Sequence, residues 1–235
     1  MSDHTSKQFD AEMEAIRSGV LSMGGLVERQ MTRAIDALRT DEDERLMDDV
    51  GADERVINQS QILIDQQCAQ IIARRQPTAV DLRVVMTVTK VVNELERIGD
   101  EIKKVAYKAA SVQGNDRLTR LRYHDVVRMA TGAQQMLRKA LDAFARLDVN
   151  EAADVVEEDD EIDVAFNAVM RQLISYMMED PRTISAALEV VFIAKSLERI
   201  GDHAKNISES VVQVVKGKDV RHATAEQIRA EVAGE

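Results

Sequence analysis

The chain has 235 residues and carries 42 Asp and Glu against 31 Lys and Arg, which gives a formal net charge of -11. Such an acidic protein is repelled by a phosphate backbone, so we expect no nucleic acid partner. Three tyrosines, four phenylalanines and no tryptophan leave an aliphatic core, and two prolines leave room for long helices. Cys68 is the only cysteine, which excludes an internal disulfide and a multi-thiolate metal site.

No stretch of the sequence has the length and apolar character of a membrane span, and the N-terminal residues do not form a secretion signal. Together with the single cysteine, this pattern predicts a cytoplasmic protein.

The two halves of the chain repeat one pattern. Residues 95–100 read LERIGD and residues 197–202 read LERIGD again, a spacing of 197 - 95 = 102. Pro77 and Pro181 fall at equivalent points of the two copies. The sequence therefore predicts an all-α fold of two tandem three-helix bundles related by internal duplication, similar to spectrin-like antiparallel bundles. We expect the first bundle at 1–112, the second at 116–216 and a C-terminal tail at 217–235.

In chain order, helices are expected at 5–39, 42–75, 79–112, 116–147, 149–179 and 182–216. Asp41 and Asp148 each precede a Glu by three residues, the spacing of an N-cap whose partner reaches back to it. Gly114 is suited to end the third helix, and Pro181 to the first turn of the sixth. The tail is expected to form one short amphipathic helix or to stay disordered.

The third and sixth helices carry the clearest packing signal, because apolar residues recur in alternating steps of four and three. Their first halves are also apolar outside this seam, so we expect both helices to lie between layers, where the two bundles meet. The two seams are Val84, Val88, Val91, Leu95, Ile98, Ile102 and Val105, and Ala186, Val190, Ile193, Leu197, Ile200, Ala204 and Ile207.

Pairs of carboxylates recur at the spacing that stacks two side chains one turn apart on a helix. One pair lies in each LERIGD motif, and related pairs lie on the middle helices, where the first copy has Asn58 at the second position. If the helices pack with these turns level, the oxygens form a hard-ligand set for Mg, Mn, Ca or Fe. The candidate metal ligands are Glu54, Glu96, Asp100, Asp159, Asp163, Glu198 and Asp202.

The alternative interpretation is an ordinary solvated acidic face. Duplication argues against it, and so does a mid-helix glycine in each motif, Gly99 and Gly201, which costs about 1 kcal/mol relative to Ala unless a close approach offsets it. Arg97 and Arg199 have the chemistry to bind phosphate or a partner's carboxylates, although pairing of Arg97 with glutamates of its own helix is the simpler expectation. His203 is expected at the surface, with a ligand role as the alternative.

Catalytic motifs are missing from the sequence. It contains no Glu-x-x-His of di-iron oxidases, no G-x-S-x-G and no phosphate-binding glycine loop. We therefore predict that the chain is not an enzyme.

The duplicated LERIGD motifs in paired three-helix units, together with the acids on the preceding helices, resemble the PhoU family over nearly the whole chain. Residues 202–207, DHAKNI, also read as this family does. The first copy departs from the pattern with EIKK at 101–104 and with Asn58 in place of an acid. This departure puts full metal occupancy of the first bundle in question.

The resemblance implies a cytoplasmic negative regulator of phosphate uptake and of the phosphate-starvation response. It implies contacts with the ATPase subunit of a phosphate ABC transporter and with a sensor histidine kinase, so that the protein reaches the membrane only through partners. It also implies a homodimer and divalent or trivalent metal ions, including multinuclear clusters, with Fe, Mn, Mg and Zn not distinguished. The alternatives are a metal-binding bundle with a storage or enzymatic role and a purely structural scaffold.

Overall fold

The computed structural model describes residues 2–39, 44–112 and 116–234, and these residues form helices and short connections without any strand. The expected six long helices are present, and no end differs from its prediction by more than three residues. The helices are α1 (Ser2–Arg39), α2 (Glu44–Arg75), α3 (Ala79–Val112), α4 (Asp116–Arg146), α5 (Val149–Glu179), α6 (Ile184–Lys216) and α7 (Ala225–Ala233), with a short 3-10 turn at Pro181–Thr183.

Local capping explains where α5 and the 3-10 turn begin. The carboxylate of Asp148 accepts hydrogen bonds from the backbone N–H groups of Asn150 and Glu151, at 3.0 and 3.2 Å, as expected of an N-cap. The expected return contact is wrong, because the Glu151 carboxylate pairs with Arg146 instead. Pro181 occupies the first position of the 3-10 turn, whereas α6 itself begins only at Ile184. The predicted cap at Asp41 and the predicted stop at Gly114 lie outside the described residues.

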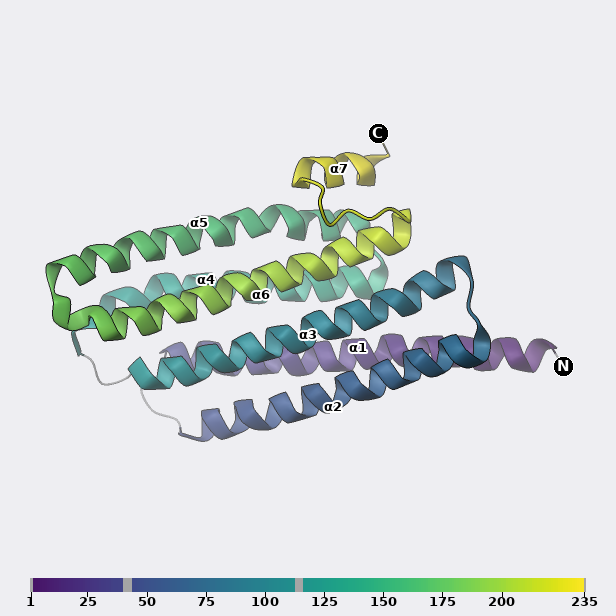
Figure 1. Cartoon of the computed structure of the whole chain (residues 1–235), viewed down its shortest axis with the longest axis horizontal. Coiled ribbons are helices and arrows are strands. Elements are labelled where there is room, and N and C mark those ends of the chain that lie inside the picture. Colours follow the sequence, from purple (N-terminus) through teal and green to yellow (C-terminus); the bar gives the residue numbers. More distant parts are fainter. Residues whose placement is uncertain (1, 40–43, 113–115, 235) are drawn as a thin grey trace.

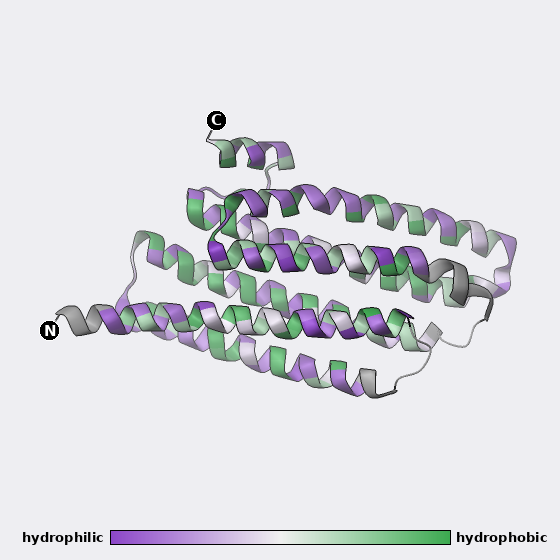
Figure 2. Ribbon diagram, turned by 180° about the vertical axis from the view of Figure 1, so that it is seen from behind, coloured by the Kyte–Doolittle hydropathy of each residue, from purple (hydrophilic) through white to green (hydrophobic). Residues whose placement is uncertain are grey.

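The predicted seams form the centres of the two bundles. Twelve of the fourteen seam residues are buried, and the first residue of each seam, Val84 or Ala186, is half-buried. Figure 2 shows hydrophobic and hydrophilic residues on different sides of the helices, which is the pattern of helices that bury one face. Aliphatic burial along this repeating stripe therefore holds each bundle together.

The two bundles lie side by side, α1–α3 in one and α4–α6 in the other (Figure 1). The most extensive contact between any two helices is that of α3 with α6, and α1 also contacts α4. The prediction that the third and sixth helices lie where the bundles meet is therefore confirmed. These helices run antiparallel, since Lys90 bonds to Gln213 while Lys108, further along α3, bonds to Glu189.

The tail forms the short helix that was one of the two expectations. Helix α7 packs on α5 (Figure 1), with Ile228 fully buried. Arg229 pairs with Asp154 and Glu157 of α5, at 2.6 and 2.8 Å. None of the helices in the described residues has the length and apolar character that crossing a bilayer requires.

Candidate functional site

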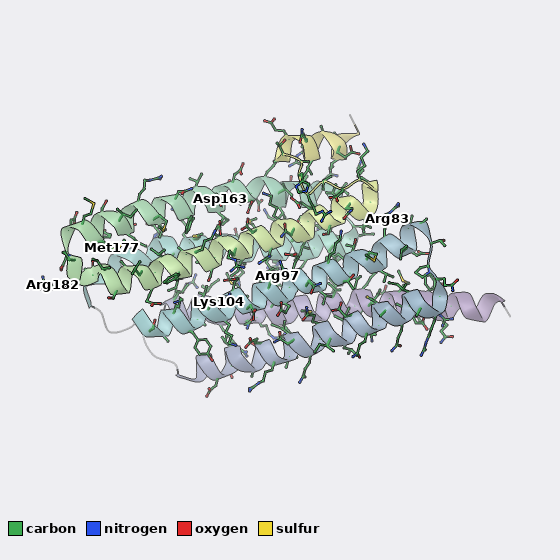
Figure 3. The ribbon with its side chains drawn as sticks, viewed as in Figure 1. Arg83, Arg97, Lys104, Asp163, Met177 and Arg182 are labelled. Atoms are coloured by element: carbon green, nitrogen blue, oxygen red, sulfur yellow. The ribbon has the colours of Figure 1, made fainter. Side chains whose placement is uncertain are left out.

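The second bundle brings its four predicted carboxylates into one electrostatic neighbourhood. Asp159 and Asp163 come from α5, and Glu198 and Asp202 from α6, the helix packed beside it; Figure 3 marks Asp163 on α5. The side chain of Asp202 is exposed, but partial desolvation beside α5 and the negative charges of Glu198 and Asp159 raise its pKa. Asp163 is exposed as well, and partial desolvation together with the charges of Asp159 and Glu198 raises its pKa. The four acids of α5 and α6 are therefore close enough to affect one another electrostatically, and their convergence on one metal ion stays a prediction.

Lysines of α6 partly neutralise this cluster. The Asp159 side chain is 7% exposed and accepts a hydrogen bond from Lys205 Nζ at 2.8 Å. Lys195 Nζ lies 2.6 Å from both carboxylate oxygens of Glu198. Asp163 and Asp202 make no ion pair with any residue that the structure describes. The cluster therefore keeps excess negative charge.

The first bundle has a weaker version of the same arrangement. Burial raises the pKa of Glu96, and the nearby charges of Asp100 and Glu54 contribute to the rise. Lys103 Nζ donates a hydrogen bond to Glu54 Oε1 at 2.7 Å. Asn58 is half-buried on α2 and brings no charge, so the first bundle has three carboxylates where the second has four.

These residues fit a metal site by their chemistry, although their carboxylates would have to move together. Among the described side chains, no three His, Cys, Asp or Glu groups are placed to hold one metal ion as they stand. The ligand atoms are nevertheless hard carboxylate oxygens, which suit such metals. In each bundle one of these carboxylates already pairs with a lysine ammonium, Glu54 with Lys103 and Asp159 with Lys205. The position of a metal on these residues stays a prediction.

The close approach predicted at the mid-helix glycines is tight at Gly99 and an ordinary van der Waals contact at Gly201. A Cβ on Gly99 would lie 3.3 Å from Gln30 Oε1 of α1, and a Cβ on Gly201 would lie 3.4 Å from Asp159 Oδ1 of α5. In the second motif, the nearest atom to that added Cβ belongs to Asp159, one of the predicted ligands. Gly201 and the predicted ligand Asp159 therefore lie next to each other in the fold.

The predicted pairing of Arg97 within its own helix is wrong. Glu94 bonds instead to His203 Nδ1 at 2.7 Å and to the Asn206 amide at 3.1 Å, across the contact between α3 and α6. Glu101 pairs with Arg199 of α6, at 2.5 Å, and with Lys104 of α3, at 2.9 Å. Arg97 makes no ion pair in the described part of the chain, and Figure 3 shows it on α3 beside α6.

His203 is buried, contrary to the expected surface position, because its ring bridges to Glu94 between the two bundles. Burial alone would raise the pKa of Glu94, but the hydrogen bonds from His203 and Asn206 outweigh it and hold that pKa below its usual value. The ring Nε2 is buried and has no hydrogen-bond partner among the described residues. This polar contact was not predicted from the sequence. The available signal was that Glu101 and His203 occupy equivalent positions in the two copies, 102 residues apart.

Comparisons with known proteins agree with the duplicated architecture. The PhoU domain matches this chain twice, at residues 20–109 and 126–211. A phosphate-specific transport system accessory protein PhoU homolog of Pseudomonas putida is 45% identical over 234 residues, covering 100% of this chain and 91% of that protein. The phosphate-specific transport system accessory protein PhoU of Escherichia coli K12 is 42% identical over 237 residues, covering 100% of this chain and 96% of that protein.

Solved structures match as well. The crystal structure of PhoU from Pseudomonas aeruginosa aligns with a TM-score of 0.85 and 44% identity, covering 89% of this chain and 100% of that one. The phosphate transport system regulatory protein PhoU from Streptococcus pneumoniae aligns with a TM-score of 0.82 and 27% identity, covering 90% and 99%. With both repeats matched and relatives aligned end to end, this chain belongs to the PhoU family.

Proposed function

We propose that this protein is a cytoplasmic regulator of phosphate homeostasis that restrains phosphate uptake and phosphate-starvation signalling and that is not itself an enzyme. The observation that carries the proposal is the end-to-end match to accessory proteins of phosphate-specific transport, at 45% and 42% identity. The regulatory protein from Streptococcus pneumoniae, which is 27% identical, has the same fold.

The proposed partners are the ATPase subunit of the phosphate ABC transporter and a sensor histidine kinase, with the protein acting as a homodimer. Long helices with exposed outer faces offer the kind of surface on which such partners dock. Pull-downs from phosphate-replete cells are expected to recover one or both partners. Recovery of neither partner would contradict the adaptor role.

Deletion of the gene tests the regulatory role. We expect phosphatase to be expressed constitutively in high phosphate, because the restraint on the starvation response is lost. Complementation with the wild-type gene should restore repression. Normal repression in the deletion strain would rule out a negative regulator.

We further propose that the acidic motifs bind divalent or trivalent metal ions, Fe, Mn, Mg or Zn, as single ions or as multinuclear clusters. Glu198, Asp202, Asp159 and Asp163 would hold metal in the second bundle, and Glu54, Glu96 and Asp100 in the first. The support is the duplicated set of hard oxygen donors with raised pKa values at Asp163, Asp202 and Glu96. Such ions would neutralise carboxylates whose charged form partial desolvation and mutual repulsion disfavour.

A double variant, Asp100→Ala with Asp202→Ala, tests whether the motifs matter for regulation. We expect it to lose metal and to shift phosphate-responsive expression, whereas the matched variant Asp160→Ala changes an exposed acid of α5 outside the motif. An unchanged response in the double variant would favour the structural scaffold. Uptake of many ions per chain, or metal-dependent turnover, would favour the storage or enzymatic alternative.

A further inference from the structure

One lysine in each bundle lies at the same place relative to the acidic motif. Lys103 follows Glu96 by seven residues, and Lys205 follows Glu198 by seven residues. Seven residues are nearly two helical turns, so each lysine shares a helix face with its motif. Each ammonium reaches the middle helix of its bundle, Lys103 to a carboxylate of α2 and Lys205 to a carboxylate of α5.

The acids that receive these lysines are themselves predicted metal ligands. Lys103 Nζ lies 2.7 Å from Glu54 Oε1, and Lys205 Nζ lies 2.8 Å from Asp159 Oδ2. The two copies differ close by, with Glu101 in one and His203 in the other. The lysine contact is nevertheless present in both, so the two bundles provide two independent instances of one arrangement.

Burial shows why these acids need a cation. The side chain of Asp159 is 7% exposed and that of Glu54 is 14% exposed. A buried carboxylate without a positive partner is strongly unfavourable. The lysines are more exposed, at 33% for Lys205 and 38% for Lys103, so either ammonium can return to water when its acid takes another cation.

We propose that Lys103 and Lys205 are built-in counter-cations that hold the acidic motifs in the metal-free protein and that an incoming metal ion displaces. The inference rests on the metal binding proposed above. In this exchange a metal–carboxylate contact replaces an ammonium–carboxylate contact, and the lysine stays protonated and enters solvent. The lysines therefore weaken metal affinity, and they keep the helices paired when metal is scarce.

Removing the lysine charge separates these two effects. We would prepare Lys205→Gln in the full-length chain, with Lys103→Gln as a second variant at the more exposed pair. Lys139→Gln is the matched control, because Lys139 also bridges to a carboxylate of α5, that of Glu158, which lies outside the motif. Binding of Mn²⁺ would be measured by calorimetry, and thermal unfolding would be measured with and without Mn²⁺.

We expect Lys205→Gln to bind Mn²⁺ about tenfold more tightly than the wild type, since the competing cation is gone. We also expect a lower unfolding temperature without Mn²⁺ and a larger rise when Mn²⁺ is added. Lys103→Gln should behave in the same direction, and Lys139→Gln should leave Mn²⁺ affinity unchanged.

Equal or weaker Mn²⁺ binding by both motif variants would overturn the counter-cation role while leaving metal binding itself intact. An equal gain in Lys139→Gln would also overturn it, because the effect would then be one of net charge. Absence of Mn²⁺ binding in every protein would overturn both this inference and the metal proposal. The regulatory function has its own test in the phosphatase assay, so the failures can be told apart.

Discussion

Two adjacent glycines of α1, Gly24 and Gly25, should respond in opposite ways to the same substitution. Both lie inside the helix, where Ala is favoured over Gly by about 1 kcal/mol. A Cβ on Gly24 would lie 2.7 Å from Leu141 Cδ2 and 2.9 Å from Cδ1, at the contact of α1 with α4. A Cβ on Gly25 would meet only Arg29 Nη1, at 4.0 Å. The pair therefore probes how tightly the bundles pack.

The magnitudes follow from these distances. Carbon atoms in contact prefer about 3.5–4.0 Å, so Gly24→Ala forces the Leu141 side chain, which is 6% exposed, to shift. Overpacking of this kind costs about 1–3 kcal/mol, which exceeds the gain of about 1 kcal/mol in helix propensity. We expect Gly24→Ala to lower the free energy of unfolding by about 1 kcal/mol and Gly25→Ala to raise it by up to about 1 kcal/mol.

Urea unfolding followed by circular dichroism measures both values on one scale, and equal slopes would show that the unfolded state is unchanged. Adding Leu141→Ala to Gly24→Ala should remove the penalty, because the double-mutant cycle isolates the pair. Equal stabilisation by the two alanines would show that α1 and α4 pack less closely than the structure has them, and the reasoning would fail.

Because the pKa of Asp202 is raised in the folded protein, the free energy of unfolding falls as pH rises through that pKa. Asp202→Asn should therefore stabilise the metal-free protein at pH 7 by about 0.5 kcal/mol and flatten this fall. A variant that urea titrations show to be less stable than the wild type would refute the prediction. Burial raises the pKa of Cys68 to about 11, so a thiol reagent at pH 8 should label it only on unfolding, and rapid native labelling would disagree. Arg229→Ala should speed hydrogen exchange in α7 and spare α6, because the ion pairs with Asp154 and Glu157 are lost; unchanged exchange would mean that apolar contacts alone hold the tail.

The helices and seams were predictable from the sequence because periodicity is a local property. Steps of three and four residues identify the buried stripe before any partner helix is known, and only the leading positions, Val84 and Ala186, are less buried than the rest. The repeat added the number of bundles, since two LERIGD motifs 102 residues apart imply two copies. These two signals together specify nearly the whole architecture.

The pairings between α3 and α6 could not be predicted in the same way. For Arg97, glutamates on its own helix were the simplest partners, and such pairs contribute only about 0.2–0.5 kcal/mol. Glu94 bonds instead to α6, and Glu101 pairs with both Arg199 of α6 and Lys104 of its own helix, because a buried carboxylate is stabilised by whichever donors reach it. The choice depends on the register of two antiparallel helices, which composition and spacing do not contain.

The sequence drew attention to the acids of the candidate site and not to its lysines. The acids stand out because like charges four residues apart repel and therefore need an explanation. Lys103 and Lys205 look like ordinary surface residues until their equivalence is noticed, at the same offset of 102 as the motifs. Comparison of the two copies position by position would have identified them.

The two motifs, although duplicated, are no longer electrostatically equivalent. The second bundle presents four carboxylates against Lys205 and Lys195, whereas the first presents three against Lys103 and lies beside Arg97, whose charge acts to lower the pKa of Glu96. A divalent cation is attracted more strongly where more negative charge remains uncompensated. If metal binds, the second bundle should fill at the lower concentration, and removal of Asp202 should abolish the tighter class of sites while removal of Asp100 abolishes the weaker one.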